Sequence, residues 1–380
     1  MVNIRFGNLK FLIRWAGWAV VLLLLLSIGR PSFGKTTEQE RQIGKEAAEQ
    51  VAKEYKFVTD PKILERVERV GRVVAAAAQA DEPDVTYTFH VIDSSDVNAF
   101  SLPGGYIYLH KGLLDKVESD DELAAVIAHE IAHVTKHHVR KLIEKSQKLS
   151  LSTLAAMVVV LASGNQVASD AVMVTQWITQ AKLSGYSVKF EQEADSTALE
   201  YLEKTPYSPV GLLTFMERLA NEEFWRPKID WGIYRTHPLS EERAAALEKA
   251  LRDKGIPIYR RHVVYSRQVQ VRDLGDSAQL VLAGKVLASV GSDNAQTAVE
   301  RATAIAKRIN SVLDTEPSPQ EVAVGVDGKS VVVRKQVVFT VTEADAAANG
   351  KTPQETAAEF CRVLRTALFN EMLNNPRLRF

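Results

Sequence analysis

The feature that most constrains this chain is a pair of histidines one helical turn apart, in His129-Glu130-Ile131-Ala132-His133. Apolar side chains recur at helical spacing from Ser119 towards Lys145, which predicts one long helix around this motif. Residues i and i+4 share a helix face, so both imidazoles can bind one metal ion. Glu130 lies at the edge of that face, where its carboxylate can accept a proton from a water on the metal. The fold must therefore bring a second element, carrying a further ligand, against this helix.

A third ligand is needed because catalytic zinc takes three protein ligands and leaves a fourth position for water. Cys361 is the single cysteine of the sequence, so the ligands must be histidines and carboxylates. The strongest candidate is Glu191, in the segment Glu191-Gln192-Glu193-Ala194-Asp195 of a second predicted helix. Asp195 shares the face of Glu191 and can hold a ligand histidine through its free ring nitrogen. Glu193 points to another side and is predicted to be a solvated charge.

These two motifs together resemble the M48 family of zinc metalloendopeptidases. Two further segments carry the resemblance, which extends from about Thr36 to Leu251. One is Asn98-Ala99-Phe100-Ser101-Leu102-Pro103-Gly104-Gly105, which is similar to a hairpin ahead of the active-site helix in that family. The other is Thr236-His237-Pro238, followed by Glu241-Glu242-Arg243.

The resemblance implies a gluzincin-like peptidase with one Zn²⁺ per chain on His129, His133 and Glu191, polypeptide substrates, and Glu130 as the general base. It also implies that the hairpin offers an edge strand to an extended substrate, since backbone hydrogen bonds hold many sequences in one geometry. The candidate substrate-binding residues are Asn98, Ala99 and Phe100. The alternative is an ordinary structural hairpin.

Two other histidines, His237 and His138, fit the family pattern without an obvious role. His237 is either a plain loop histidine, a fourth ligand in a resting form, or a donor to the developing oxyanion. His138 is expected to pack or cap a helix rather than to bind metal. The sequence departs from the family at Val188, after Ser187, where an arginine is common, and this puts substrate contacts there in doubt.

Residues 1–34 have the plan of a signal peptide. Basic residues come first, at Arg5, Lys10 and Arg14. An uncharged run from Trp15 to Ile28 follows, and small residues at Ser32 and Gly34 fit cleavage after Gly34. A retained membrane anchor is the alternative. Either way we expect the rest of the chain to be exported, in the periplasm or anchored to the outer face of the cytoplasmic membrane.

Charge and local hydropathy bear on the partners. Lys plus Arg and Asp plus Glu number 47 each, so no overall field favours nucleic acid as a partner. The nearly uninterrupted apolar segment 149–163 is short for a spanning helix, which needs about 20 residues. It is expected to be a buried helix, a hairpin that touches the membrane surface, or a lid beside the active site.

The predicted fold class is α+β, with a mainly helical peptidase domain over 35–257 that includes a small sheet and hairpin. Near Pro257 the sequence becomes rich in valine and in alternating patterns, which predicts a smaller α+β domain over 258–380. The strands predicted there are 263–271, 279–287, 322–326 and 330–341. This domain carries no metal-like cluster, so substrate recruitment, partner binding or stabilisation suits it better than a second activity.

A second function must be weighed against peptide hydrolysis. The chain could be an exported binding or chaperone-like module whose zinc site is latent and self-inhibited, since both His237 and the apolar segment 149–163 permit this. A closed structural zinc site is a poor third reading, because it calls for four protein ligands and no adjacent base.

Overall fold

The computed structural model of this protein describes residues 36–143, 159, 186–226, 232–237 and 240–373. The predicted leader lies outside these residues, as does all of the segment 149–163 except Val159. Val159 is buried in a small apolar cluster with Ile43 and Phe100. No helix within the described ranges is long and apolar enough to cross a membrane.

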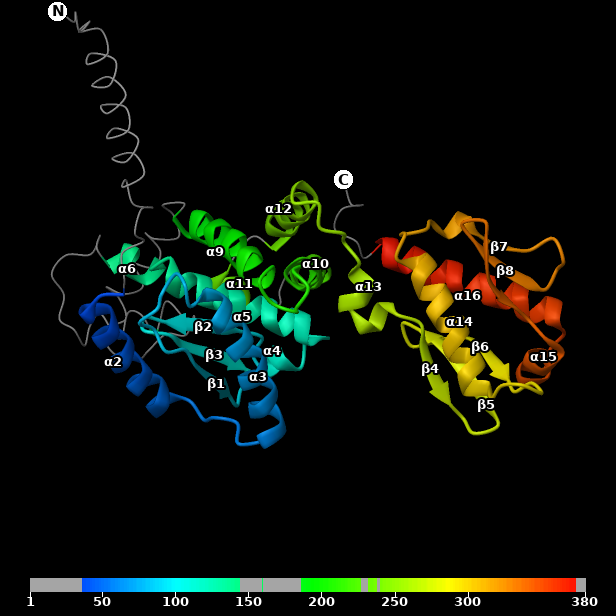
Figure 1. Ribbon diagram of the computed structural model, residues 1–380, viewed down its shortest axis with the longest axis horizontal. Helices are drawn as coiled ribbons and strands as arrows, with labels where there is room; N and C mark the ends of the chain where they lie inside the picture. Colours follow the sequence, from blue (N-terminus) through cyan, green and yellow to red (C-terminus); the bar gives the residue numbers. More distant parts are fainter. Residues whose placement is uncertain (1–35, 144–158, 160–185, 227–231, 238–239, 374–380) are drawn as a thin grey trace, which may run out of the picture.

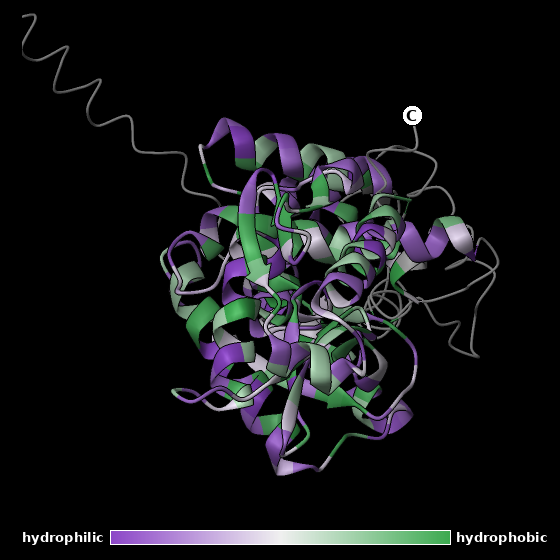
Figure 2. Cartoon of the chain, turned by 90° about the vertical axis from the view of Figure 1, so that its right-hand side faces the viewer, coloured by the Kyte–Doolittle hydropathy of each residue, from purple (hydrophilic) through white to green (hydrophobic). Residues whose placement is uncertain are grey.

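The N-terminal half consists of helices around a three-stranded sheet (Figure 1). Its helices, in chain order, are α2 (Glu38–Glu54), α3 (Pro61–Ala78), α4 (Lys111–Leu114), α5 (Asp120–Thr135), α6 (His138–Ile143), α9 (Tyr186–Leu202), α10 (Val210–Trp225), α11 (Gly232–Thr236) and α12 (Ser240–Asp253). Hydrophobic and hydrophilic residues alternate along the helices in Figure 2, as expected of amphipathic helices packed around a core.

The sheet has the order β1-β3-β2 and comprises β1 (Thr88–Ile92), β2 (Ala99–Leu102) and β3 (Tyr106–His110). β1 is parallel to β3, whereas β2 and β3 form the predicted antiparallel hairpin. Gly104 and Gly105 make its turn possible, because both have φ near +90° (86° and 97°), a conformation that side chains with a Cβ rarely adopt. Because β2 comes last in the strand order, it is an edge strand of the described sheet.

Helix α5 is the centre of this half and contacts α3, α9, α10 and β2. Its start is fixed by Ser119, whose Oγ accepts a hydrogen bond from the Glu122 N–H. The prediction of one helix running towards Lys145 is wrong, because α5 ends at Thr135. The chain turns at His137, which has a φ of 50°, and α6 then begins in a new direction.

His137 is held in this turn by two buried carboxylates. Its Nδ1 lies 3.0 Å from Glu40 Oε1 on α2, and its Nε2 lies 2.9 Å from Glu82 Oε1 in the loop after α3. Arg140 and Thr36 complete the cluster, since Arg140 pairs with Glu40 and Thr36 donates to Glu82. The C-terminal end of α5 is thus tied to the N-terminal helix and to the loop leading into the sheet.

The C-terminal half packs two long helices, α14 (Ala298–Leu313) and α16 (Pro353–Leu373), against two three-stranded sheets. The first sheet comprises β4 (Gln270–Asp273), β5 (Ser277–Leu282) and β6 (Lys285–Gly291). The second comprises β7 (Val322–Val324), β8 (Ser330–Val333) and β9 (Gln336–Thr340), followed by the short helix α15 (Glu343–Asn349). The predicted α+β class is confirmed for both halves.

Three of the predicted strands in this half are wrong. Residues 263–271 are mostly helical turns, α13 (Arg260–Val263) and a 3₁₀ turn (Tyr265–Arg267), because Val263 and Val264 pack into the core of the N-terminal half. The single strands predicted at 279–287 and 330–341 are each a hairpin. Their two-residue turns, Ala283-Gly284 and Arg334-Lys335, have positive φ throughout, as type I′ turns require, but lack the usual Asn-Gly signal.

The two halves meet through a buried arginine. Arg260 is 5% exposed and pairs with Glu217 of α10, Glu248 of α12 and Glu316 beyond α14. The core of the N-terminal half extends as far as Val264. The domain boundary near Pro257 remains a prediction.

Candidate metal centre

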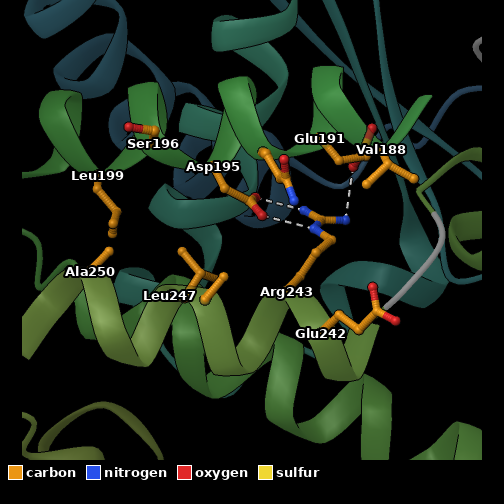
Figure 3. Close-up of a pocket in the computed structure, with 11 residues that line it drawn as sticks. Val188, Glu191, Asp195, Ser196, Leu199, Glu242, Arg243, Leu247 and Ala250 are labelled. Atoms are coloured by element: carbon orange, nitrogen blue, oxygen red, sulfur yellow. Dashed lines mark hydrogen bonds and ion pairs between the residues drawn. The ribbon is translucent and has the colours of Figure 1, made fainter. Parts of the chain in front are cut away.

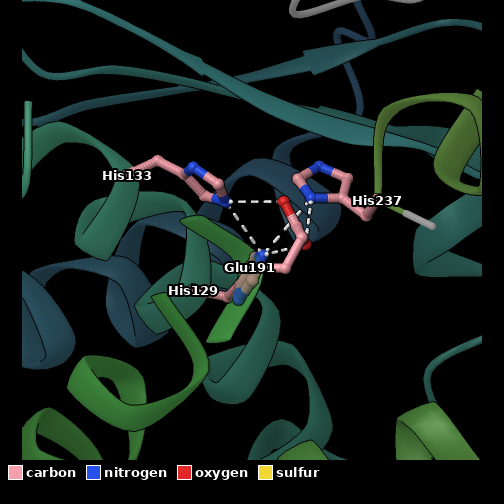
Figure 4. Close-up of side chains that lie close together, drawn as sticks. All are labelled: His129, His133, Glu191 and His237. Carbon is pink, nitrogen blue, oxygen red and sulfur yellow. Dashed lines mark hydrogen bonds and ion pairs between the residues drawn. The ribbon is translucent and has the colours of Figure 1, made fainter. Parts of the chain in front are cut away.

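Helices α5 and α9 pack against each other and bring the predicted ligands together. His129 and His133 lie one turn apart on α5, with their Nε2 atoms 3.1 Å from each other. Glu191 extends from α9 between them, with Oε2 3.3 Å from His129 Nε2 and Oε1 3.4 Å from His133 Nε2 (Figure 4). The spacing fits a tetrahedral zinc ion, whose ligands at 2.0–2.1 Å would lie about 3.3 Å apart.

His237 supplies a fourth ligand atom to the cluster. Its Nδ1 lies 3.0 Å from Glu191 Oε2 and 3.3 Å from His129 Nε2, and all four ligand atoms lie within 4.8 Å of one another. The other ring nitrogen of His237 is 3.4 Å from Glu130 Oε1. If an ion is held by His129, His133 and Glu191, His237 would lie at the remaining ligand position, beside the predicted general base.

The short helix α11 that leads to His237 is fastened to the start of β2. The Ile233 N–H donates to the Val97 carbonyl oxygen at 3.1 Å, and the Thr236 hydroxyl donates to Asn98 Oδ1 at 3.2 Å. The Gly232 N–H donates to Asp96 Oδ1. Contacts with the segment before the edge strand thus set the position of His237.

Asp195 lies where the sequence placed it, with Oδ1 3.0 Å from His129 Nδ1. This contact orients the ring so that Nε2 faces the other ligands. Arg243 of α12 pairs with both oxygens of Asp195 and, through Nη1, with Glu191 Oε2 at 2.8 Å (Figure 3). The buried guanidinium of Arg243 therefore holds the predicted ligand Glu191 in place. It also holds Asp195, the carboxylate that orients His129.

Sequence reasoning gave Arg243 no role, although a signal was present. It shares one face of α12 with Leu247 and Leu251, and a charge on an apolar stripe calls for a buried partner. Val188, at the position where the family often has an arginine, lines a cavity of about 290 Å³ between α9 and α12, and Arg243 lines the same cavity (Figure 3).

Comparison with known proteins agrees with this geometry. The sequence model of peptidase family M48 matches residues 61–251, which include every residue of the cluster. The chain belongs to peptidase family M48. A second match, to a domain of unknown function (DUF8459), covers residues 279–371.

Individual relatives of this M48 chain carry protease names. The beta-barrel assembly-enhancing protease of Escherichia coli K12 is 29% identical over 54% of this chain and 42% of its own length. Metalloprotease LoiP of the same strain is 32% identical over 44% of this chain and 64% of its own. The mitochondrial metalloendopeptidase OMA1 of Schizosaccharomyces pombe is 28% identical over 56% and 61%. The chain thus matches between 42% and 64% of the length of these relatives.

The predicted family and the zinc cofactor are confirmed, and the cluster is suited to bind a metal ion. The donor set itself fits zinc, since imidazole nitrogen and carboxylate oxygen are its usual ligands when cysteine is absent. His129, His133 and Glu191 would hold the ion, with His237 able to add a fourth ligand.

Electrostatics prepare these groups for a cation. Burial alone would raise the pKa of Glu191, but the charges of His237 and Arg243 hold it well below its ordinary value. Burial lowers the pKa of His133 well below its usual range, which leaves a neutral ring with a lone pair for metal. Burial would also lower the pKa of His129, yet hydrogen bonds to Asp195 and Glu191 raise it to about 9, so metal binding there must displace a proton.

The three predicted substrate-binding residues are buried in the hairpin. The side chain of Asn98 accepts a hydrogen bond from the Thr236 hydroxyl. Phe100 stacks on Tyr108 with ring centroids 4.9 Å apart. The His110 N–H donates to the Asn98 carbonyl oxygen, so by antiparallel alternation the backbone of Ala99 points away from β3. The side chains of Asn98 and Phe100 therefore serve the fold, and a substrate contact here would use the strand's backbone.

Glu193, predicted to be a solvated charge, is partly exposed and also has two partners on α6. Its side chain is 36% exposed and pairs with Lys141 at 3.1 Å and with His138 Nε2 at 3.2 Å. His138 is buried and contacts the ligand His133 directly. Helical spacing along α9 alone could not show this, because both partners lie on α6.

Proposed function

We propose that this protein is an endopeptidase that hydrolyses peptide bonds in exported or envelope polypeptides, with Glu130 as the general base. One observation carries the proposal. Glu130 is buried beside the fourth ligand position, with its Oε1 3.4 Å from the ring that occupies it. A water in place of that ring would lie within reach of the same carboxylate.

The chemistry follows from these positions. Zinc, when bound, supplies an acidified water and polarises the scissile carbonyl. Glu130 accepts a proton from the attacking water and returns it to the nitrogen of the leaving amine. His129, oriented by Asp195, and Glu191, braced by Arg243, keep the ligand geometry fixed during this transfer.

The substrate is proposed to bind as an extended strand along β2. By the register of β2 and β3, the N–H and C=O groups of Ala99 and Ser101 point away from β3, and they would offer a substrate hydrogen bonds that do not depend on its sequence. The leader-like pattern of residues 1–34 supports action on exported proteins in the periplasm, or at the outer face of the cytoplasmic membrane.

The test replaces Glu130 with Gln, which keeps the size of the side chain but removes the base. We expect the Glu130→Gln protein to retain zinc and to lose casein hydrolysis by at least 10²-fold. Glu200→Gln, an exposed residue of α9, is the matched control and should leave activity unchanged. Normal hydrolysis by purified Glu130→Gln would refute the assignment.

A second candidate function has its own observation, the presence of His237 among the ligands. A chain held in this form would bind exported proteins, as a chaperone does, and keep its peptidase site latent. His237→Ala distinguishes the two readings. Casein hydrolysis should rise if His237 suppresses a peptidase, remain absent if the module only binds, and fall with zinc retained if His237 assists the oxyanion.

A further inference from the structure

Each acidic residue of Glu191-Gln192-Glu193-Ala194-Asp195 serves the metal centre by a different route. Glu191 is a ligand, and Asp195 contacts the Nδ1 of His129. Glu193 reaches the other α5 ligand through an intermediate: its Oε2 lies 3.2 Å from His138 Nε2, and His138 Nδ1 lies 2.8 Å from His133 Nδ1. Both ligand histidines of α5 therefore have a hydrogen-bonded chain that ends on a carboxylate of α9.

The protons of this chain can be arranged in one way that leaves the ligand free. The Glu193 carboxylate has no proton to give, so His138 Nε2–H must donate to it. His138 Nδ1 then carries a lone pair and accepts from His133 Nδ1–H. The remaining nitrogen of His133, Nε2, keeps its lone pair for the metal.

His138 is also packed so that its ring cannot rotate away. Its exposed fraction is 2%, and it stacks on Phe190 with ring centroids 4.3 Å apart and planes at 12°. Phe190 directly precedes the ligand Glu191 on α9. The ring thus bridges the two ligand-bearing helices by stacking on one side and by hydrogen bonds at both nitrogens.

We propose that His138 is a positioning residue which, together with Glu193, fixes the ring of His133 with Nε2 towards the metal and so sets how tightly the site retains zinc. The proposal rests on the zinc cluster and not on the role of Glu130, so metal binding can test it in a protein that cleaves nothing. Loss of such an outer partner typically costs 10- to 100-fold in metal affinity.

The experiment measures zinc affinity of the full chain by competition with a chromophoric chelator, with Co²⁺ substitution as a spectroscopic check on ligand geometry. His138→Leu fills the space beside Phe190 but accepts no hydrogen bond, and should weaken zinc binding 10- to 100-fold and alter the cobalt d–d bands. His138→Asn places an oxygen near the former Nδ1 and should restore most of the affinity. Lys141→Ala leaves the Glu193–His138 contact in place and should stay within twofold of wild type.

Zinc affinity and cobalt spectra of His138→Leu equal to those of wild type would overturn the proposal. Equal losses in His138→Asn and His138→Leu would also overturn it, since only packing would then matter. Should His138→Leu fail to fold, Glu193→Ala decides, because that side chain is partly exposed and its removal leaves the core intact. A several-fold loss of zinc affinity in Glu193→Ala supports the proposal, and an unchanged affinity refutes it.

Discussion

The buried charge of His137 can be tested through the pH dependence of stability. Burial alone would lower its pKa, but hydrogen bonds to Glu40 and Glu82 raise it to about 9. The ordinary value of about 6.5 applies in the unfolded chain. Because the folded-state pKa is the higher one, the stabilisation is fully present below pH 6.5 and disappears as the pH rises to about 9.

The size of this effect follows from the shift. Between about 6.5 and about 9 the difference is some 2.5 pKa units, and at 1.36 kcal/mol per unit this is about 3 kcal/mol. His137→Gln carries no titrating group at this position, so subtracting its free energy of unfolding from that of wild type removes the titrations that the two proteins share. We expect this difference to fall by about 3 kcal/mol between pH 6 and pH 10.

The assay is urea-induced unfolding of both proteins at intervals of half a pH unit, followed by circular dichroism. Glu82→Gln is a useful companion, because losing one carboxylate partner should move the upper end of the transition below pH 9. A difference between wild type and His137→Gln that stays constant from pH 6 to pH 10 would show that folding does not raise the pKa of His137. The charge argument would then be wrong.

Three other substitutions test single contacts. Arg243→Met leaves the carboxylates of Asp195 and Glu191 buried without their guanidinium partner, and should lower the free energy of unfolding of metal-free protein by about 3–5 kcal/mol in a urea titration. Gly44→Ala would place a Cβ 1.7 Å from the Pro103 carbonyl oxygen, so α2 must move from the hairpin turn and calorimetry should record a loss of about 1–3 kcal/mol. Arg260→Met removes the partner of Glu217 between the halves and should cost a similar 3–5 kcal/mol, with no change in zinc affinity.

The ligands could be found from the sequence because helix geometry alone fixes their relation. Residues four apart, such as His129 and His133 or Glu191 and Asp195, share a face wherever a helix is placed. The apolar residues around both motifs predict buried helices, and a catalytic zinc ion that needs three protein ligands would bring these two helices together. No knowledge of the loops between them is needed.

Turns that depend on a positive φ at residues other than glycine could not be predicted from the sequence. Arg334 and Lys335 turn the chain between β8 and β9, although local preference would carry a strand straight through them. The positive φ of His137 likewise turns the chain just after the end of α5, whereas the apolar pattern of the sequence continues past this residue towards Lys145. In each case tertiary contacts, not local preference, select the conformation.

The turn at His137 explains why the link from Glu193 through His138 to the ligand His133 could not be predicted from the sequence, although His138 packs as expected and is not among the cluster's ligand residues. On a continuous helix His138, five residues after His133, would point about 140° away from it. The turn returns the chain so that the two rings lie with their Nδ1 atoms 2.8 Å apart. That turn is held by Glu40, 97 residues earlier in the chain, and by Glu82. The surroundings of a zinc ligand therefore depend on a buried charge cluster that no local pattern around the histidine motif could show.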